Sequence, residues 1–490
     1  MKKIENKVML ITYADSMGGD LKQLDAILDK YFSGMFGGVH VLPFFPSSGD
    51  RGFAVIHYNE VDPAFGTWED IDRLAEKYYL MADFMLNHVS IRCEEFRDYM
   101  EHGDASPYRD MFIHWNEFWP GGEPTAEELD ALYRRKNQGP YFEFTRKDGK
   151  AVRLWNTFFE EQADIDPYAP ATRDYYRRNL TKLADHVPLV RFDAFAYASK
   201  VPGTSCFFVE PQIWDVLEAA MEPLRERGTE MLPEIHENYT IQMKIADKGY
   251  WVYDFALPAL MLHTLFTGDA GPLHHWLEIC PRKQFTTLDT HDGIGMVDVQ
   301  GLLTEEQIDA LTRKVDGYTA DVKALLKMPS IIRVPGKKVM RYQLITSYYS
   351  ALNCDDHAYL LARAMQYFTP GIPQVYYVGM LAGRNDIDGL KRNGEPRSVN
   401  RHNYTEEEIA QALDRKIVRD LNEITRFRNS CDAFNGDVAI APLTGPGRIR
   451  VTWTKGSHST TLDADFLSRE FTITERRNST ETLIFEQKKL

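Results

Sequence analysis

The chain has 490 residues, too many for one small domain, and 43% of them are apolar, which supplies a large core and excludes global disorder. Lys and Arg number 57 against 72 Asp and Glu, so the net charge is −15, which argues against nucleic acid or an anionic membrane as the main partner. Five scattered cysteines without CxxC spacing predict free thiols, with no disulfide framework and no structural zinc site.

The N-terminal residues are charged and lead directly into a short apolar run, Val8–Ile11, which is too short for the apolar region of a signal peptide. The other apolar runs are strand-sized and fall far below the ~20 residues of a membrane span. We therefore expect a cytoplasmic protein, a monomer or a homodimer, that acts on small molecules.

Eight short apolar runs recur along the chain. Because their apolar character is nearly continuous, they predict strands that are covered on both faces. Amphipathic stretches between them predict helices and right-handed parallel crossovers, so the fold class is α/β and the architecture a (β/α)8 TIM barrel. The predicted strands are Val8–Asp15, Gly38–Phe45, Leu80–His88, Leu189–Ala196, Glu230–His236, Tyr250–Leu257, Gln284–His291 and Gly371–Val378. The predicted helices include Asp20–Phe32, Thr67–Tyr78, Thr172–His186, Pro211–Arg227 and His357–Phe368.

Two of the gaps between strands are too long for simple loops. They predict an inserted domain B at 89–166 and an inserted domain B′ at 293–355, the second with a helix over Thr304–Val315. The barrel then comprises 1–88, 167–292 and 356–434 and ends in one long helix, Glu406–Arg428. The tail at 435–490 alternates polar and apolar residues, which predicts a small antiparallel β C-terminal domain.

Carboxylates stand where barrel strands end, which is where the active sites of such barrels lie. Asp193 and Glu234 end adjacent strands, and a retaining glycosidase needs two carboxyl groups about 5–5.5 Å apart. Arg191 projects from the same face of its strand as Asp193 and would keep that carboxylate charged. Asp292, after the seventh strand, could stabilise an oxocarbenium-like transition state. A single acidic residue at a strand end is commonly an ordinary capping or loop residue. The occurrence of several such residues at the ends of successive strands predicts cleavage of a glycosidic bond.

Four segments at these strand ends resemble the signature regions of the α-amylase superfamily, glycoside hydrolase family 13. They are NHVS at 87–90, VRFDA at 190–194, PEIHE at 233–237 and THD at 290–292. Further segments are similar to the sucrose phosphorylase group, which includes sucrose 6′-phosphate phosphorylases. These are GGVHVLPFFPSSGDRGF at 37–53, GTSCFFVEP at 203–211, TLDTHDGIG at 287–295, PQVYYVG at 373–379 and VNRHNY at 399–404.

The resemblance implies a retaining phosphorylase that needs no metal and no cofactor, with inorganic phosphate as co-substrate. It implies that Asp193 is the nucleophile, Glu234 the general acid/base and Asp292 the stabiliser of the transition state. It also implies that two residues, Tyr342 and Gln343, belong to a mobile loop that contacts fructose or phosphate. The residues implied to bind the sugar are Asp50, Phe53, His88, Arg191, Tyr197, His291 and Arg401.

Phosphate also requires cations, and the candidates are Arg134 and Arg135 in the first insertion with Lys338 and Arg341 in the second. The stretch from Lys327 to Arg341 holds five cations and no acid. The group has an acidic and an aliphatic residue where this chain has Met340 and Arg341. Two interpretations stay open: a solvated loop, or a leaving group that carries phosphate, which slightly favours sucrose 6′-phosphate over sucrose.

Other activities remain open with the same carboxylates. A sucrose or α-glucoside hydrolase or transglucosylase would use the same double displacement without a phosphate requirement. A glucosylglycerol- or glucosylglycerate-type phosphorylase would differ only in the leaving group. A non-catalytic relative is disfavoured because all three carboxylates are present.

Overall fold

The computed structural model describes residues 2–136, 139–326, 331–332 and 340–488. The predicted phosphate-binding residue Lys338 lies outside this part of the chain. Two compact units can be distinguished. The first consists of Met1–Lys3, Val41–Ile235 and Ile331–Met340, and the second of Ile4–His40, His236–Ser330 and Arg341–Leu490.

The eight predicted strands form one eight-stranded sheet, the nearly closed parallel sheet of a (β/α)8 barrel, which confirms the predicted fold class. Each strand is shorter than its predicted run and lies inside it, except that β3 begins one residue early, at Tyr79; the polar residues at the carboxyl ends lie outside the strands. The order is β10-β11-β16-β1-β2-β3-β8-β9. The bounds are β1 (Met9–Thr12), β2 (Gly38–Val41), β3 (Tyr79–Met85), β8 (Leu189–Asp193), β9 (Glu230–Pro233), β10 (Val252–Asp254), β11 (Gln284–Thr286) and β16 (Ile372–Tyr376).

Several of the helices between these strands begin at a side-chain cap. In α1, the side chain of Asp20 accepts a hydrogen bond from the amide of Gln23 at 2.8 Å. In α2, Thr67 and Asp70 form the capping box that the sequence predicts. The helices are α1 (Leu21–Tyr31), α2 (Trp68–Lys77), α6 (Pro170–Ala184), α7 (Gln212–Arg225), α8 (Tyr239–Asp247), α9 (Leu257–Thr267), α10 (Gly271–Ile279), α13 (Tyr348–Ala351), α14 (Asp356–Phe368), α15 (Tyr377–Met380) and α16 (Ile387–Asn393).

The prediction of one helix over Glu406–Arg428 is wrong. The segment forms two helices, α17 (Glu406–Leu413) and α18 (Lys416–Ser430). The backbone is extended at Arg415, whose guanidinium donates hydrogen bonds to the carbonyl oxygens of Leu381 and Ala382 at 3.2 and 3.0 Å. These contacts with a distant loop hold the break, and the helical periodicity of the sequence does not reveal them.

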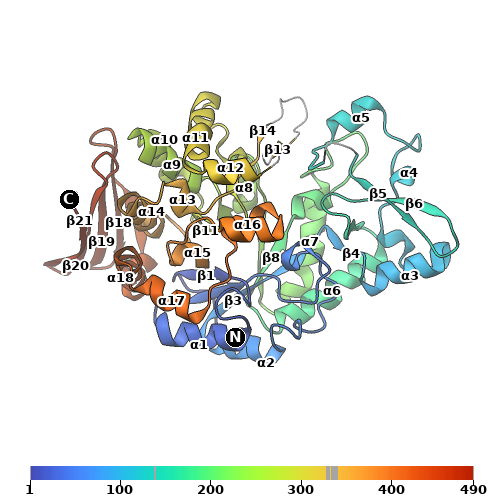
Figure 1. Ribbon diagram of the computed structural model, residues 1–490, viewed down its shortest axis with the longest axis horizontal. Helices are drawn as coiled ribbons and strands as arrows, with labels where there is room; N and C mark the ends of the chain where they lie inside the picture. Colours follow the sequence, from blue (N-terminus) through green and yellow to red (C-terminus); the bar gives the residue numbers. More distant parts are fainter. Residues whose placement is uncertain (1, 137–138, 327–330, 333–339, 489–490) are drawn as a thin grey trace. The chain divides into compact units, whose positions relative to one another are not determined.

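The first insertion has its own core in the first unit. Two antiparallel pairs, β4 with β7 and β5 with β6, lie with three helices in the part of the chain coloured from blue to teal (Figure 1). Three tryptophans, Trp115, Trp119 and Trp155, pack together with ring centroids 5.1–6.2 Å apart. The bounds are α3 (Glu94–His102), α4 (Trp115–Phe118), α5 (Ala126–Ala131), β4 (His88–Ser90), β5 (Tyr141–Thr145), β6 (Ala151–Trp155) and β7 (Gln162–Asp164).

The second insertion contains the predicted helix as α11 (Glu305–Tyr318), which is followed by α12 (Ala320–Leu325). Its short strands are β12 (Ile294–Gly295), β13 (Ile331–Ile332), β14 (Met340–Arg341) and β15 (Gln343–Leu344). β12 pairs with β15, so residues directly after Asp292 hold the segment that carries Tyr342 and Gln343.

The tail forms one five-stranded antiparallel sheet in the second unit, as predicted (Figure 1, dark red). The indole nitrogen of Trp453 donates to the carbonyl oxygen of Phe368 at 2.9 Å, which fixes the sheet against the end of α14. The strands are β17 (Asp437–Ile440), β18 (Arg448–Lys455), β19 (His458–Asp465), β20 (Glu470–Arg477) and β21 (Thr480–Gln487). All five cysteines are free thiols. Within the described residues, no helix has the length and apolar character that crossing a membrane requires.

Candidate active site

Arg191 is the centre of a buried charge cluster in the first unit. Its register partner on β3 is Asp83, and Arg191 Nη1 lies 2.5 Å from Asp83 Oδ1 and 2.8 Å from Asp193 Oδ1. The Arg191 side chain is only 3% exposed and that of Asp83 is fully buried. Charge-assisted hydrogen bonds of this kind fix both partners in geometry. The Asp193 carboxylate, 15% exposed, is therefore oriented by a guanidinium that Asp83 holds from behind.

Glu234 joins the same cluster from the end of β9. Its Oε1 lies 3.7 Å from Arg191 Nη2, and its Oε2 accepts a hydrogen bond from the amide of Ala194 at 3.1 Å. Ala194 has φ 53°, a left-handed conformation that costs a non-glycine residue about 1 kcal/mol or more. This turn directly follows Asp193 and directs an N–H group at Glu234. The structure thus brings together the two carboxyl groups that the sequence predicts as a pair.

The predicted sugar-binding residues of the first unit lie around Phe53. Gln162 Nε2 donates to Asp50 Oδ2 at 3.3 Å and to the Phe53 carbonyl oxygen at 3.4 Å. His88 Nε2 also donates to that oxygen, at 3.1 Å. Burial lowers the pKa of His88, so the imidazole is neutral and its Nδ1 is an acceptor. The guanidinium of Arg191 lies over the Phe53 ring, 5.8 Å from its centroid.

An aromatic cluster surrounds Tyr197 in the first unit. Tyr197 meets Phe158 and Phe207 edge-to-face, with centroids 5.1 and 4.8 Å away, and Phe207 stacks on Tyr133 at 3.9 Å. Phe158 also contacts the His88 ring at 5.5 Å. Of this cluster, only Tyr197 was predicted from the sequence as a binding residue. The signal that could have found them is the aromatic richness of the first insertion and the FF pair in GTSCFFVEP.

A buried lysine connects the first insertion to the end of β3. Lys200 Nζ lies 2.9 Å from Asp164 Oδ2 and donates to Asn87 Oδ1 at 2.7 Å and to the Tyr197 carbonyl oxygen at 2.6 Å. Burial raises the pKa of Asp164, but Lys200 and the hydrogen bonds from Thr157 outweigh it and hold that pKa below its ordinary value. The Lys200 ammonium group is thus surrounded by oxygen atoms of Asp164, Asn87 and Tyr197. Its ion pair with Asp164 holds the segment that carries Phe158 and Gln162.

The second unit contains a charge cluster around Asp292. Arg397 Nη2 lies 3.1 Å from Asp292 Oδ1, whereas the predicted sugar ligand Arg401 is 4.0 Å from the same oxygen and donates through Nε to the His291 carbonyl at 3.0 Å. His291 Nε2 is 3.8 Å from Asp292 Oδ2. Burial alone would raise the pKa of Asp292, but the nearby positive charges, Arg397 first, hold it far below its ordinary value. Arg397 was not among the residues predicted from the sequence.

Tyr342 and Gln343 are held in the second unit beside His236. The Met296 amide donates to the Tyr342 carbonyl oxygen at 2.9 Å, and both side chains of the pair are buried, at 6% and 1% exposure. The Tyr342 ring meets His236 edge-to-face at 6.0 Å. His236 Nδ1 lies 3.3 Å from Asp298 Oδ2, and burial raises the pKa of Asp298 to about 6 although His236 opposes the shift.

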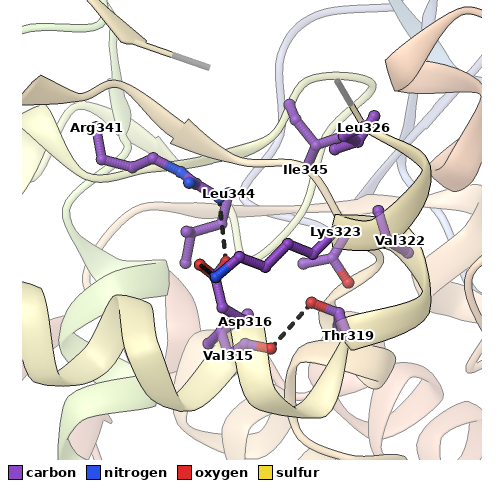
Figure 2. A pocket seen from close by; sticks show the side chains of 10 residues that line it. Val315, Asp316, Thr319, Val322, Lys323, Leu326, Arg341, Leu344 and Ile345 are labelled. Atoms are coloured by element: carbon purple, nitrogen blue, oxygen red, sulfur yellow. Dashed lines mark hydrogen bonds and ion pairs between the residues drawn. The ribbon is translucent and has the colours of Figure 1, made fainter. Parts of the chain in front are cut away.

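Arg341 lies in a pocket of about 340 Å³ between α11, α12 and the strand that contains Gln343 (Figure 2). The Asp316 carboxylate forms ion pairs with both Arg341, at 3.1 Å, and Lys323, at 3.0 Å. Arg341 Nε also donates to the Gln343 carbonyl oxygen at 3.3 Å. Figure 2 shows both cations directed at the single carboxylate. The apolar wall consists of Val315, Val322, Leu326, Leu344 and Ile345.

The predicted phosphate-binding arginines of the first insertion lie in the first unit. Arg134 is buried, and its Nη2 is paired with Asp130 Oδ1 at 3.2 Å. Arg135 is half-buried. The next cation, Lys136, donates to the Asn156 carbonyl oxygen at 3.0 Å. Arg134 and Arg341 each have an ion pair with a carboxylate, Asp130 and Asp316 respectively.

Comparison with known proteins shows which proteins the chain resembles in sequence and in fold. Residues 11–237 match the family described as the alpha amylase catalytic domain. The chain is 46% identical to a sucrose phosphorylase of Streptococcus mutans, over 99% of this chain and 100% of that protein. It is 42% identical to a sucrose 6(F)-phosphate phosphorylase of Thermoanaerobacterium thermosaccharolyticum, over 96% and 97%. A crystal structure of sucrose 6F-phosphate phosphorylase from Thermoanaerobacter thermosaccharolyticum matches with TM-score 0.93 at 41% identity and covers 98% and 99% of the two chains.

Proposed function

Because the chain belongs to the α-amylase family and, within it, to the group of sucrose phosphorylases and sucrose 6F-phosphate phosphorylases, we propose that it cleaves a sucrose-type α-glucoside with inorganic phosphate. The products are α-glucose 1-phosphate and fructose or fructose 6-phosphate. The observation that carries the proposal is the contact of one buried guanidinium, Arg191, with both carboxyl groups that the reaction needs, Asp193 at 2.8 Å and Glu234 at 3.7 Å.

The reaction proceeds by two inversions at the anomeric carbon. In the first, the Asp193 carboxylate attacks that carbon while Glu234 gives its proton to the glycosidic oxygen, and the fructosyl unit leaves as an alcohol. In the second, a phosphate oxygen attacks the glucosyl ester, Glu234 takes the proton of the phosphate, and Asp193 is released. Asp292, which the surrounding arginines keep ionised, stabilises the positive charge that develops on the sugar ring.

The sugar is bound by neutral and charged groups with different tasks. His88 is neutral, so its Nδ1 accepts a hydrogen bond from a hydroxyl group and adds no fixed charge. Asp50, oriented by Gln162, accepts charge-assisted bonds from further hydroxyls. Tyr197 and Phe158 supply apolar walls of the kind that the flat faces of sugar rings contact.

For the leaving group we propose fructose 6-phosphate, so that sucrose 6′-phosphate is the preferred substrate. Support comes from the pocket around Arg341, where two cations share one carboxylate and leave a net positive charge. The basic stretch from Lys327 to Arg341 adds charge of the same sign in a protein of net charge −15. Sucrose is the second candidate, because Arg341 and Arg134 each have an acidic partner that offsets their attraction for a phosphate.

One assay tests both levels of the proposal. Glucose 1-phosphate is measured from sucrose and from sucrose 6′-phosphate, each with and without inorganic phosphate. We expect product with both donors only when phosphate is present, and a higher kcat/KM with the phosphorylated donor. Glucose release that is independent of phosphate would instead identify a hydrolase, and equal or higher kcat/KM for sucrose would reject the phosphorylated leaving group.

A further inference from the structure

Three side chains of different chemistry meet in the second unit, where the chain passes from α18 to the C-terminal sheet. The Cys431 Sγ atom lies 3.6 Å from His458 Nε2, and His458 Nε2 lies 2.7 Å from Glu475 Oε1. The three potential ligand atoms are all within 4.8 Å of one another. Cys431 is 4% exposed, and the side chains of His458 and Glu475 are 16% and 14% exposed.

The pairing of β19 with β20 explains why His458 and Glu475 meet. His458 lies opposite Arg477, and Glu475, two residues earlier on β20, points to the same face of the sheet. Cys431 is the C-cap residue of α18, and its sulfur atom lies beside that face of the sheet. The three positions are far apart in sequence and have no CxxC or HxxxH spacing, which is why the sequence predicts no metal site.

The spacing of the atoms fits a tetrahedral zinc ion. With Zn–S of about 2.3 Å, Zn–N of about 2.0 Å and tetrahedral angles, sulfur and nitrogen ligands are about 3.5 Å apart. The distance from Cys431 Sγ to His458 Nε2 is 3.6 Å. The contact from His458 to Glu475 must open from 2.7 Å to about 3.3 Å, a movement within the freedom of a glutamate side chain.

An ion could reach this cluster from solvent. Cys431 is among the residues that line a hollow of about 550 Å³, together with Glu5 and Asp432, which give it two further carboxylates. Arg477 contacts the same oxygen of Glu475 at 3.0 Å, and Lys455 pairs with Asp432 at 2.7 Å. Glu475 has a second oxygen, so Arg477 can stay paired while one oxygen binds an ion.

We propose that Cys431, His458 and Glu475 form a Zn²⁺ site with a fourth position open to water, and that the ion connects the end of α18 to the C-terminal sheet. Thiolate, imidazole and carboxylate are the ligands that zinc takes in proteins. Binding converts the thiol to a thiolate and releases its proton to solvent, while the imidazole carries its remaining proton on Nδ1. Without metal, burial first and the Glu475 charge next raise the pKa of Cys431 to about 12, so the empty site holds a thiol.

The experiment uses the full-length protein, freed of metal with a chelator, and Co²⁺ as the spectroscopic probe. We expect a thiolate-to-cobalt charge-transfer band and visible bands of tetrahedral intensity that saturate at one equivalent and disappear when Zn²⁺ is added. Cys431→Ser should abolish the charge-transfer band, and His458→Gln should weaken Co²⁺ binding by about tenfold or more. Zn²⁺ should raise the Tm of the wild type and leave that of Cys431→Ser unchanged.

Cys354→Ser is the matched control, because Cys354 is a free thiol of the same unit and lies outside the cluster. Its Co²⁺ spectrum should equal that of the wild type. Circular dichroism establishes that each variant is folded, and His458→Gln gives an independent reading if Cys431→Ser fails to fold. The proposal is overturned if the wild type shows no charge-transfer band, if the band survives in Cys431→Ser, or if His458→Gln binds Co²⁺ as tightly as the wild type.

Discussion

The Lys200–Asp164 pair allows a prediction whose size follows from the structure. Lys200→Met keeps the length and the apolar stem of the side chain but leaves the fully buried Asp164 carboxylate without its cation. Loss of one partner of a buried pair costs about 3–5 kcal/mol. Asp164 keeps hydrogen bonds from Asn87 Nδ2 at 3.0 Å, from the Thr157 amide at 2.9 Å and from the Thr157 hydroxyl at 2.5 Å. We therefore expect the lower end, about 3 kcal/mol.

Urea unfolding followed by tryptophan fluorescence is the assay, because the Trp155 ring lies 5.6 Å from Lys200 Nζ and reports on this region. Lys147→Met is the matched control. Lys147 pairs with Glu101 at the surface of the same unit, so its loss should cost less than about 1 kcal/mol. If Lys200→Met and Lys147→Met shift the transition equally, the buried pair does not stabilise the insertion as argued.

The pH dependence gives a second reading of the same variant. The folded pKa of Asp164 is below its ordinary value, so the wild type gains stability from this carboxylate above that ordinary value and loses it as the pH falls through the folded pKa. Lys200→Met removes the positive charge that contributes most to lowering the pKa of Asp164. The difference in stability between wild type and variant should therefore be largest near neutral pH and shrink in acid, and a difference that is constant with pH would contradict this assignment.

Three further predictions concern catalysis, specificity and pH. Asp193→Asn should lower kcat by several orders of magnitude with an unchanged circular dichroism spectrum, and near-normal turnover would remove Asp193 from the nucleophile role. Arg341→Ala should raise KM for sucrose 6′-phosphate by about tenfold or more and leave sucrose unaffected. Lys323→Ala, which removes a 63% exposed and solvent-screened cation from the same carboxylate, should raise that KM by less. Burial raises the pKa of Asp254 to about 7 although the indole N–H of Trp276 donates to it, so stability should fall as pH rises from the ordinary pKa of this carboxyl towards about 7. Asp254→Asn should flatten the fall over that range, and an unchanged slope would exclude Asp254 as the titrating group.

The barrel could be predicted from the sequence because its strands are buried on both faces. Runs such as Leu80–His88 are apolar almost without interruption, and no surface helix produces that pattern. The C-terminal sheet was predicted only from its apolar strands. β19, with the sequence HSTTLDAD, has few large apolar residues and gains its pairing from its neighbours, so the pattern of the sequence alone did not identify it.

The site was predictable where it depends on strand ends and hidden where it depends on loops. Arg191 follows from the two-residue period of a strand, which places it beside Asp193. Arg397 lies in a short 3-10 helix, Pro396–Asn400, and Phe158 lies in an irregular segment, and neither has a periodicity in the sequence that says which way the side chain points. Arg401 was predicted to bind sugar from the family resemblance alone, and the resemblance did not point to Arg397, whose guanidinium lies 3.1 Å from Asp292.

The most direct test of the double displacement is to trap the covalent intermediate. Glu234→Gln should still form the glucosyl-enzyme from α-glucosyl fluoride, a donor whose leaving group needs no proton, and should be slow to release it. Mass spectrometry of digested protein should then find one glucosyl residue on the peptide that contains Asp193. A modification on another peptide, or none while the donor is consumed, would contradict the account.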